Sequence, residues 1–126
     1  VMAETEKITI NIDVVDLGKI DLLVEQGFYS NRTDLIKNSI RQELQKHEEV
    51  VSKIVVSKSY NVGVTKISKE ELEDVARSNK ILDLKVLGLL IIAEDVPIEL
   101  AKKTIKYLNV FGVFKAPAEV KALFMK

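Results

Sequence analysis

The first regular pattern in the chain is an alternation of apolar and polar residues between Glu6 and Asp13. Every second position is an isoleucine and the positions between are polar, which is the two-residue period of a β-strand with one buried face. Isoleucine is β-branched and therefore favours strands. The isoleucines are Ile8, Ile10 and Ile12, and the polar positions include Lys7, Thr9 and Asn11. The pattern predicts a short strand with one apolar and one polar face.

After this strand the apolar period changes to that of an amphipathic helix. Asp13 can cap the helix, with Asp16 as its partner in a capping box, and Gly27 is suited to end it. The predicted apolar stripe consists of Leu17, Ile20, Leu23 and Val24.

A second helix is predicted to begin at Asn31, whose side chain can cap it, with Asp34 at the third helical position. This helix can continue through His47 toward Val51, although β-branched residues weaken the helical pattern there. Its apolar stripe consists of Leu35, Ile36, Ile40 and Leu44.

The predicted strand has no partner close to it in the sequence, because the segments that follow are helical. A lone strand with one apolar face must pair with another chain or with the distant second half of the sequence. Pairing with its own copy across a two-fold axis is the simplest solution, so we expect a homodimer through the N-terminal strand.

The order of strand, helix, glycine-containing turn and helix resembles that of the ribbon-helix-helix DNA-binding proteins, the MetJ/Arc/CopG superfamily. The matching stretch runs from Lys7 to Leu44. It includes the alternating strand, the Leu17/Ile20/Leu23 spacing, Gly27 and the run Tyr29–Ile36. The resemblance implies that strands from two protomers form an antiparallel ribbon in the DNA major groove, which is about 12 Å wide and admits such a ribbon.

The resemblance also implies which residues contact DNA. Lys7, Thr9 and Asn11 would read the bases, and their donors, acceptors and methyl group suit base edges. Simple solvation of a surface strand would produce the same polar face, so the alternation alone leaves both readings open. Phosphates are attracted to free N–H groups at a helix start. The residues expected to hold the DNA backbone there are Ser30, Asn31, Arg32 and Thr33. Ordinary capping by Asn31 is compatible with this role.

Three glycines recur in the second half at spacings of 25 and 24 residues, namely Gly63, Gly88 and Gly112. Each is followed by a short apolar stretch and then by an acidic helix opening. This arrangement predicts three strand–turn–helix units stacked side by side, a short solenoid in the manner of leucine-rich repeats. The middle run, Val86–Ile92, is predicted to be the most buried strand. A plain α/β domain with an accidental glycine spacing is the alternative.

Two prolines support the predicted helix starts in this half. Pro97 and Pro117 are placed in the first turn of a helix, where a missing N–H costs nothing.

Composition limits the chemistry available to the chain. Of its 126 residues 47% are apolar and 30% charged, so it can bury a core. The 19 basic and 19 acidic residues cancel, which argues against strong nonspecific binding to nucleic acid. With no cysteine, one histidine (His47) and no phosphate-binding glycine motif, we expect no enzyme, no cofactor and no metal site. No apolar run is long enough to span a bilayer and no signal-peptide pattern opens the chain, so we expect a cytoplasmic protein.

These observations predict an α+β protein with two domains. Residues 1–56 would form a ribbon-helix-helix domain for DNA binding and dimerisation, and residues 57–126 a small α/β domain of strand-helix repeats, solenoid-like in form. The expected function is sequence-specific binding of double-stranded DNA by a homodimer that represses transcription. The alternative is a structural, assembly or antitoxin-like protein. Such a protein would use its N-terminal fold only to dimerise and its C-terminal half for a protein partner or a higher oligomer.

Overall fold

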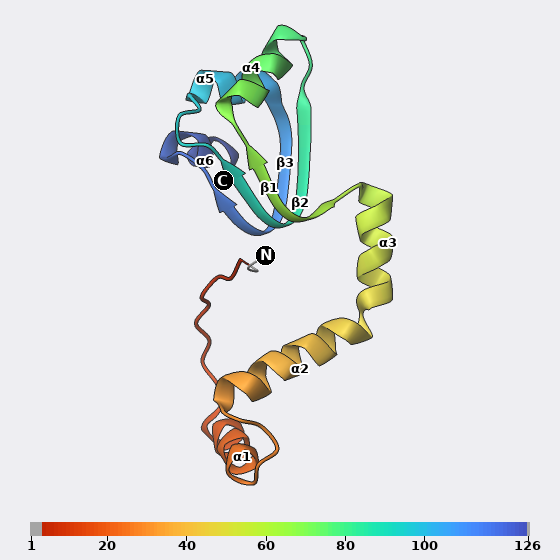
Figure 1. Cartoon of the computed structure of the whole chain (residues 1–126), viewed down its shortest axis with the longest axis vertical. Coiled ribbons are helices and arrows are strands. Elements are labelled where there is room, and N and C mark those ends of the chain that lie inside the picture. Colours follow the sequence, from red (N-terminus) through yellow and green to blue (C-terminus); the bar gives the residue numbers. More distant parts are fainter. Residues whose placement is uncertain (1–3, 126) are drawn as a thin grey trace. The chain divides into compact units, whose positions relative to one another are not determined.

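The computed structural model describes residues 4–125, and the ends of the two predicted domains, residues 1–3 and 126, lie outside it. The chain divides into two units, residues 5–53 and the residues from Ile54 onward. The described residues form six helices and one three-stranded parallel sheet, so the fold is mixed α and β (Figure 1).

Helix α1 (Val14–Glu25) begins and ends at the residues that the sequence indicates. A carboxylate oxygen of Asp13 accepts a hydrogen bond from the Val15 N–H at 3.2 Å. The predicted capping box is not formed, because Asp16 makes no return bond to the cap among the described residues. Gly27 takes the left-handed conformation with φ 86°, which stops the helix as predicted.

Helix α2 (Arg32–Lys46) is capped as predicted, since the Asn31 side chain accepts from the Asp34 N–H at 2.8 Å. Its end differs from the prediction. The helix stops at His47, whose φ of −108° and ψ of 11° interrupt the helical path.

A separate helix that the sequence analysis missed, α3 (Glu48–Lys58), follows directly. Its first turn carries Glu48 and Glu49, which stabilise a helix N-terminus through the dipole. Its four valines and one isoleucine are weak helix formers, which hid this helix in the sequence.

Residues 6–13, predicted as a strand, lie outside any helix or strand of the single chain (Figure 1). A strand is defined by its ladder partner, and residues 4–125 supply none for this segment. The side chains of Ile8 and Ile10 are consequently 74% and 64% exposed. No residue from 4 to 58 is buried, so the N-terminal unit closes no core within one chain.

The C-terminal unit alternates strands and helices and pairs its strands in chain order. Both neighbouring pairs, β1 with β2 and β2 with β3, are parallel, so each connection must cross over and does so through a helix. The elements are β1 (Asn61–Ile67), α4 (Lys69–Arg77), β2 (Leu82–Ile92), α5 (Ile98–Thr104), β3 (Ile105–Lys115) and α6 (Ala118–Phe124). The description of these three units as a solenoid stays a prediction.

The helix starts of this unit are set by local chemistry. Ser68 and Glu71 form a complete capping box at α4. Pro97 and Pro117 occupy the N-cap positions of α5 and α6, one residue before the first turn where the sequence analysis placed them.

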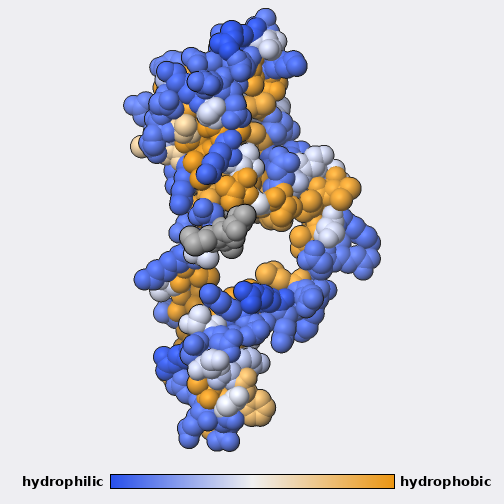
Figure 2. All heavy atoms as spheres, in the orientation of Figure 1, coloured by the Kyte–Doolittle hydropathy of each residue, from blue (hydrophilic) through white to orange (hydrophobic). Residues whose placement is uncertain are grey.

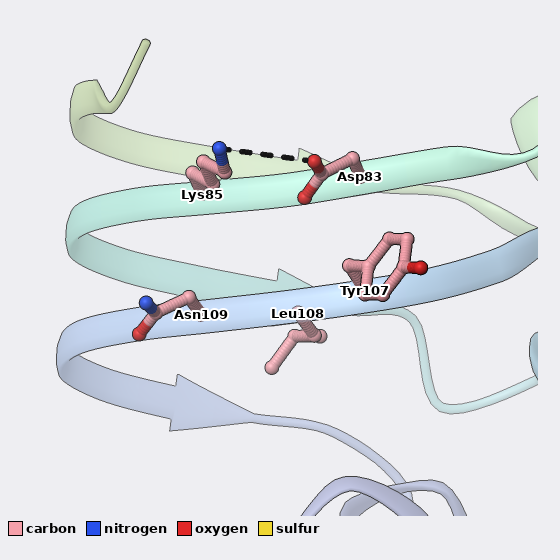
Figure 3. A pocket seen from close by; sticks show the side chains of 5 residues that line it. All are labelled: Asp83, Lys85, Tyr107, Leu108 and Asn109. Atoms are coloured by element: carbon pink, nitrogen blue, oxygen red, sulfur yellow. Dashed lines mark ion pairs between the residues drawn. The ribbon is translucent and has the colours of Figure 1, made fainter. Parts of the chain in front are cut away.

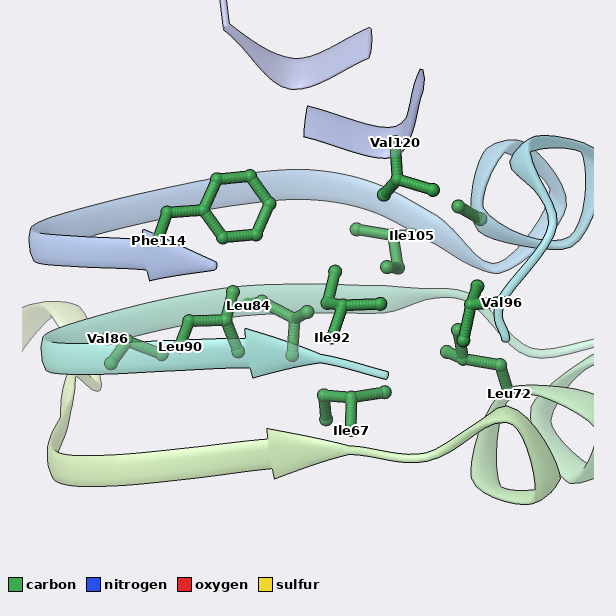
Figure 4. Close-up of a cluster of buried hydrophobic side chains, with 11 residues drawn as sticks. Ile67, Leu72, Leu84, Val86, Leu90, Ile92, Val96, Ile105, Phe114 and Val120 are labelled. Atoms are coloured by element: carbon green, nitrogen blue, oxygen red, sulfur yellow. The ribbon is translucent and has the colours of Figure 1, made fainter. Parts of the chain in front are cut away.

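The recurring glycines lie in one row across the sheet, Gly63 opposite Gly88 and Gly88 opposite Gly112. All three have positive φ, between 117° and 138°. Strand β2 turns back between Val86 and Leu90, the stretch that contains Gly88, and β3 turns back beside it, so that the two halves of each strand face one another across the core (Figure 4). A Cβ built on Gly88 would overlap the carbonyl oxygen of Gly63, and one on Gly112 would overlap that of Gly88. The glycines therefore allow both the turn and the close approach of neighbouring strands.

The core of the C-terminal unit lies between these strand halves and the helices. Strand β2 has more buried residues than β1 or β3, which confirms the prediction for the middle run. The largest fully buried apolar side chains are Leu72, Val86, Leu90, Ile92 and Val120. The one buried polar side chain of the described residues, Thr104, donates to the Leu100 carbonyl at 2.7 Å, so the core leaves no polar atom unsatisfied.

Gly63 and Gly88 have similar backbone conformations but different surroundings, so alanine substitutions at the two positions should lower stability by different amounts. Gly63→Ala should lower the free energy of unfolding of the C-terminal unit by about 1–2 kcal/mol, the cost of a side chain at positive φ. Gly88→Ala should cost roughly 1–3 kcal/mol more, because its Cβ also overlaps the neighbouring strand. Denaturant unfolding followed by circular dichroism measures both. Equal losses for the two variants would contradict the close strand contact at Gly88.

Candidate nucleic-acid interface

The residues predicted to read bases stand on the segment that precedes α1. The side chains of Lys7, Thr9 and Asn11 are exposed, and so are those of Ile8 and Ile10 between them. Both faces of the segment are therefore available, one polar and one apolar. The polar face can contact a ligand only if the apolar face is covered.

The N-terminus of α2 is organised by hydrogen bonds among its own residues. The Asp34 carboxylate accepts from the Ser30 N–H at 3.0 Å and from the Asn38 amide at 2.9 Å. The N–H groups of Arg32 and Thr33 are first-turn donors with no carbonyl partner inside a helix. These two groups and the hydroxyls of Ser30 and Thr33 are what the site offers to a phosphate, while the charge of Asp34 opposes one.

Arg32 is the first residue of α2, as the sequence predicts, but its guanidinium is engaged by a carboxylate of α1. Its Nε donates to one oxygen of Asp21 at 2.8 Å and its Nη2 to the other at 2.9 Å, a two-bond fork that joins α2 to α1. Both side chains are about half exposed, 56% for Arg32 and 49% for Asp21. In the single chain the guanidinium is thus neutralised by a carboxylate.

Sequence reasoning missed Asp21 as a member of this site. It lies in the middle of α1, eleven residues before Arg32, and no local pattern links the two positions. Only the packing of α1 against α2 brings them together.

The ion pair shifts the proton equilibria of both partners. Hydrogen bonds from Arg32 lower the pKa of Asp21, slight loss of hydration opposes this, and the guanidinium charge lowers it further. The same hydrogen bonds and the carboxylate charge raise the pKa of Arg32. The stability that this pair contributes is therefore present above the ordinary pKa of a free aspartate, about 3.9, and is lost as the pH falls through the lowered value.

The C-terminal unit has a second polar site, a hollow of about 430 Å³ on the outer face of β2 and β3 (Figure 3). It is lined by Asp83, Lys85, Tyr107, Leu108 and Asn109. Lys85 pairs with Asp83 at 3.8 Å, and the Asn109 amide donates to the Tyr60 hydroxyl at 2.8 Å. The two opposite charges in the hollow thus pair with each other, and Asn109 uses one of its donors on a residue outside the lining.

Two further observations concern the described residues, 4–125. They hold no cluster of three or more His, Asp or Glu side chains that could bind a metal ion. None of their helices has the length and apolar character needed to cross a bilayer.

A family model described as the Ribbon-Helix-Helix transcriptional regulator family matches residues 3–121. The match thus extends over the C-terminal strands and helices as well as the segment and helices before them. No curated protein and no solved structure matches the chain.

The Asp21–Arg32 pair can be tested by titration. Arg32→Gln should raise the pKa of Asp21 toward that of an ordinary aspartate, because the hydrogen bonds and the charge that lower it are removed. NMR of the Asp21 carboxyl carbon as a function of pH measures the change. Lys19→Gln, which removes a cation of α1 that has no ion pair with Asp21 in the described residues, should leave the titration unchanged. An unaltered Asp21 midpoint in the Arg32 variant would contradict the pair.

Proposed function

Because the chain belongs to the ribbon-helix-helix transcriptional regulator family, we propose that it is a sequence-specific DNA-binding repressor that acts as a homodimer. The proposal includes a cytoplasmic location and no catalytic role. The observation that carries it is the segment before α1, which is alternating, exposed on both faces and without a strand partner among residues 4–125.

Dimerisation would remove the apolar face of the segment before α1 from contact with water. Ile8 and Ile10 are mostly exposed, and burying one such side chain completely is worth about 1.5–3 kcal/mol. Two segments paired antiparallel across a two-fold axis would share one apolar face and satisfy each other's backbone groups. The exposed parts of Leu22, Ile40 and Leu44 would be covered by the helices of the second copy.

Pairing would also create the DNA-reading surface. The residues opposite the isoleucines are Lys7, Thr9 and Asn11, which would project together from a two-stranded ribbon into the major groove. Ser30, Asn31 and Thr33 at the start of α2 would position the phosphates on either side. In this arrangement the bases are read by side chains and the backbone is held mainly by N–H and hydroxyl groups.

A gel shift at several salt concentrations separates this function from a purely structural one. Since the 19 basic and 19 acidic residues cancel, few phosphates can be neutralised, and the salt dependence should be modest. Binding of particular genomic fragments over others at moderate salt supports the regulator. No binding even at low salt would leave the N-terminal unit as a dimerisation device.

A protein partner or a higher oligomer at the C-terminal unit is the second candidate. Val62, Val64 and Phe111 are 68%, 49% and 55% exposed beside the glycine row, on the outer surface of the sheet. Apolar (orange) surface is visible on this unit in Figure 2. Exposed apolar residues of neighbouring strands are typical of association surfaces. This role can accompany DNA binding or, in the structural alternative, replace it.

Dimerisation through the isoleucine face is tested by two adjacent substitutions. Ile10→Glu should prevent the dimer and unfold the N-terminal unit, because a carboxylate would have to enter the apolar interface. Thr9→Glu places the same charge on the opposite face and should leave the dimer intact. Analytical ultracentrifugation at micromolar concentration, with circular dichroism, measures both effects. A folded, dimeric Ile10→Glu protein would contradict the shared isoleucine face.

Base reading is tested at Asn11. Asn11→Ala removes a side chain that can make two hydrogen bonds to adenine, so affinity for the preferred duplex should fall by about 1–3 kcal/mol per half-site. Affinity for a duplex of unrelated sequence should change little. The preferred duplex is obtained by selection from a random pool with the wild-type protein. An equal loss on both duplexes would show that Asn11 does not read a base.

A further inference from the structure

We propose that Asp21 is a positioning residue for DNA binding, which competes with a DNA phosphate for the guanidinium of Arg32. The inference rests on the proposed DNA-binding function and adds a residue of α1 to it. In free protein Asp21 holds Arg32, and in the complex a phosphate takes its place.

The geometry of the fork makes the competition direct. Asp21 occupies both donors on one edge of the guanidinium, Nε and Nη2, at 2.8 and 2.9 Å. Paired oxygens of a phosphate recognise the same edge in the same two-bond manner. A phosphate on this edge must displace the carboxylate, and one that approached another edge would still meet its negative charge.

The position of Arg32 makes a phosphate the natural competitor. It is the first residue of α2, next to the first-turn donors of the helix and the hydroxyl of Thr33. Asp34, in the same turn, carries a negative charge that offsets the positive end of the helix dipole. Attraction of a phosphate to this helix start therefore depends on the positive charge of Arg32. While it is paired with Asp21, the two charges cancel.

The exposure of the pair allows the exchange. With side chains 56% and 49% exposed, both partners keep contact with water, and ion pairs of this kind are weak. A correctly placed phosphate can therefore replace Asp21 as the partner of Arg32 at a small cost in free energy. A distant or misplaced phosphate is not attracted, since a neutral pair exerts little long-range force.

The experiment measures DNA affinity and its salt dependence for four variants of the full chain. Asp21→Asn keeps the shape of the side chain and removes its charge. Glu25→Gln is the matched control, because it removes one negative charge from the same helix at a residue that has no ion pair in the described part of the chain. Arg32→Gln and the double variant Asp21→Asn/Arg32→Gln complete a cycle. The probe is a labelled duplex of mixed sequence and fixed length.

Asp21→Asn should bind this duplex about two- to fivefold more tightly for each Arg32 released, the equivalent of an exposed ion pair. Its salt dependence should stay close to that of the wild type, because Arg32 contacts the same phosphate in both complexes, whereas Arg32→Gln should flatten the dependence by about one unit of slope per lost contact. Glu25→Gln should change affinity much less. The double variant should bind like Arg32→Gln, because Asp21 affects binding only through its ion pair with Arg32 and that arginine is absent.

Several results would overturn the proposal. An equal gain for Glu25→Gln would mean that only net charge matters, and a loss of affinity in a folded Asp21→Asn protein would mean that Asp21 assists binding. If neither wild type nor any variant binds DNA at low salt, the proposed function itself fails, which is a distinct outcome.

A measurement on the wild type covers the case in which Asp21→Asn does not fold. The Nε–H signal of Arg32 in an NMR spectrum reports its partner. It should move on addition of the duplex as the carboxylate is replaced by a phosphate. A signal unchanged at saturation would show that Arg32 stays on Asp21 and would refute the competition.

Discussion

In the dimer that we propose, burial of the Ile8–Ile12 face is the interaction on which the N-terminal unit depends. Its helices α1 and α2 contact each other, yet no described residue from 4 to 58 is buried, so two amphipathic helices and one unpaired segment do not make a core. Folding such a unit requires that apolar area offset the loss of chain entropy, and a single copy offers too little of it. Association is therefore a condition of the fold we propose, and the polar face that would read DNA exists as a rigid surface only after it.

The C-terminal unit, by contrast, buries a core of apolar side chains within one chain. Strands β2 and β3 turn back at the glycine row, so that each of them encloses apolar side chains between its own two halves while pairing with the strand beside it (Figure 4). This arrangement brings the backbones of neighbouring strands close together at Gly88 and Gly112, which excludes any side chain at these two positions. What it leaves outside is apolar surface at Val62 and Phe111, available for a partner.

Features fixed by neighbouring residues could be predicted from the sequence. The caps at Asp13 and Asn31, the stop at Gly27 and the register of the three glycines follow from local chemistry and spacing. The break at His47 and the helix after it could not, because weak helix formers and acidic residues give opposing signals. The Asp21–Arg32 pair could not be predicted for another reason. It depends on how α1 packs against α2, and spacing rules relate only residues within one helix.

The charge arrangement indicates how such a chain can bind DNA without a basic surface. A protein with many free cations gains affinity for any sequence, so its discrimination must come from base contacts against a strong background. Here the net charge is zero and Arg32 is neutralised by Asp21, and we propose that it stays so until a phosphate takes the place of the carboxylate. Attraction would thereby be confined to a duplex that already fits the proposed ribbon, because only then would a phosphate lie within reach of the guanidinium. In the complex that we propose, low background affinity and a conditional cation would leave recognition of the sequence to Lys7, Thr9 and Asn11.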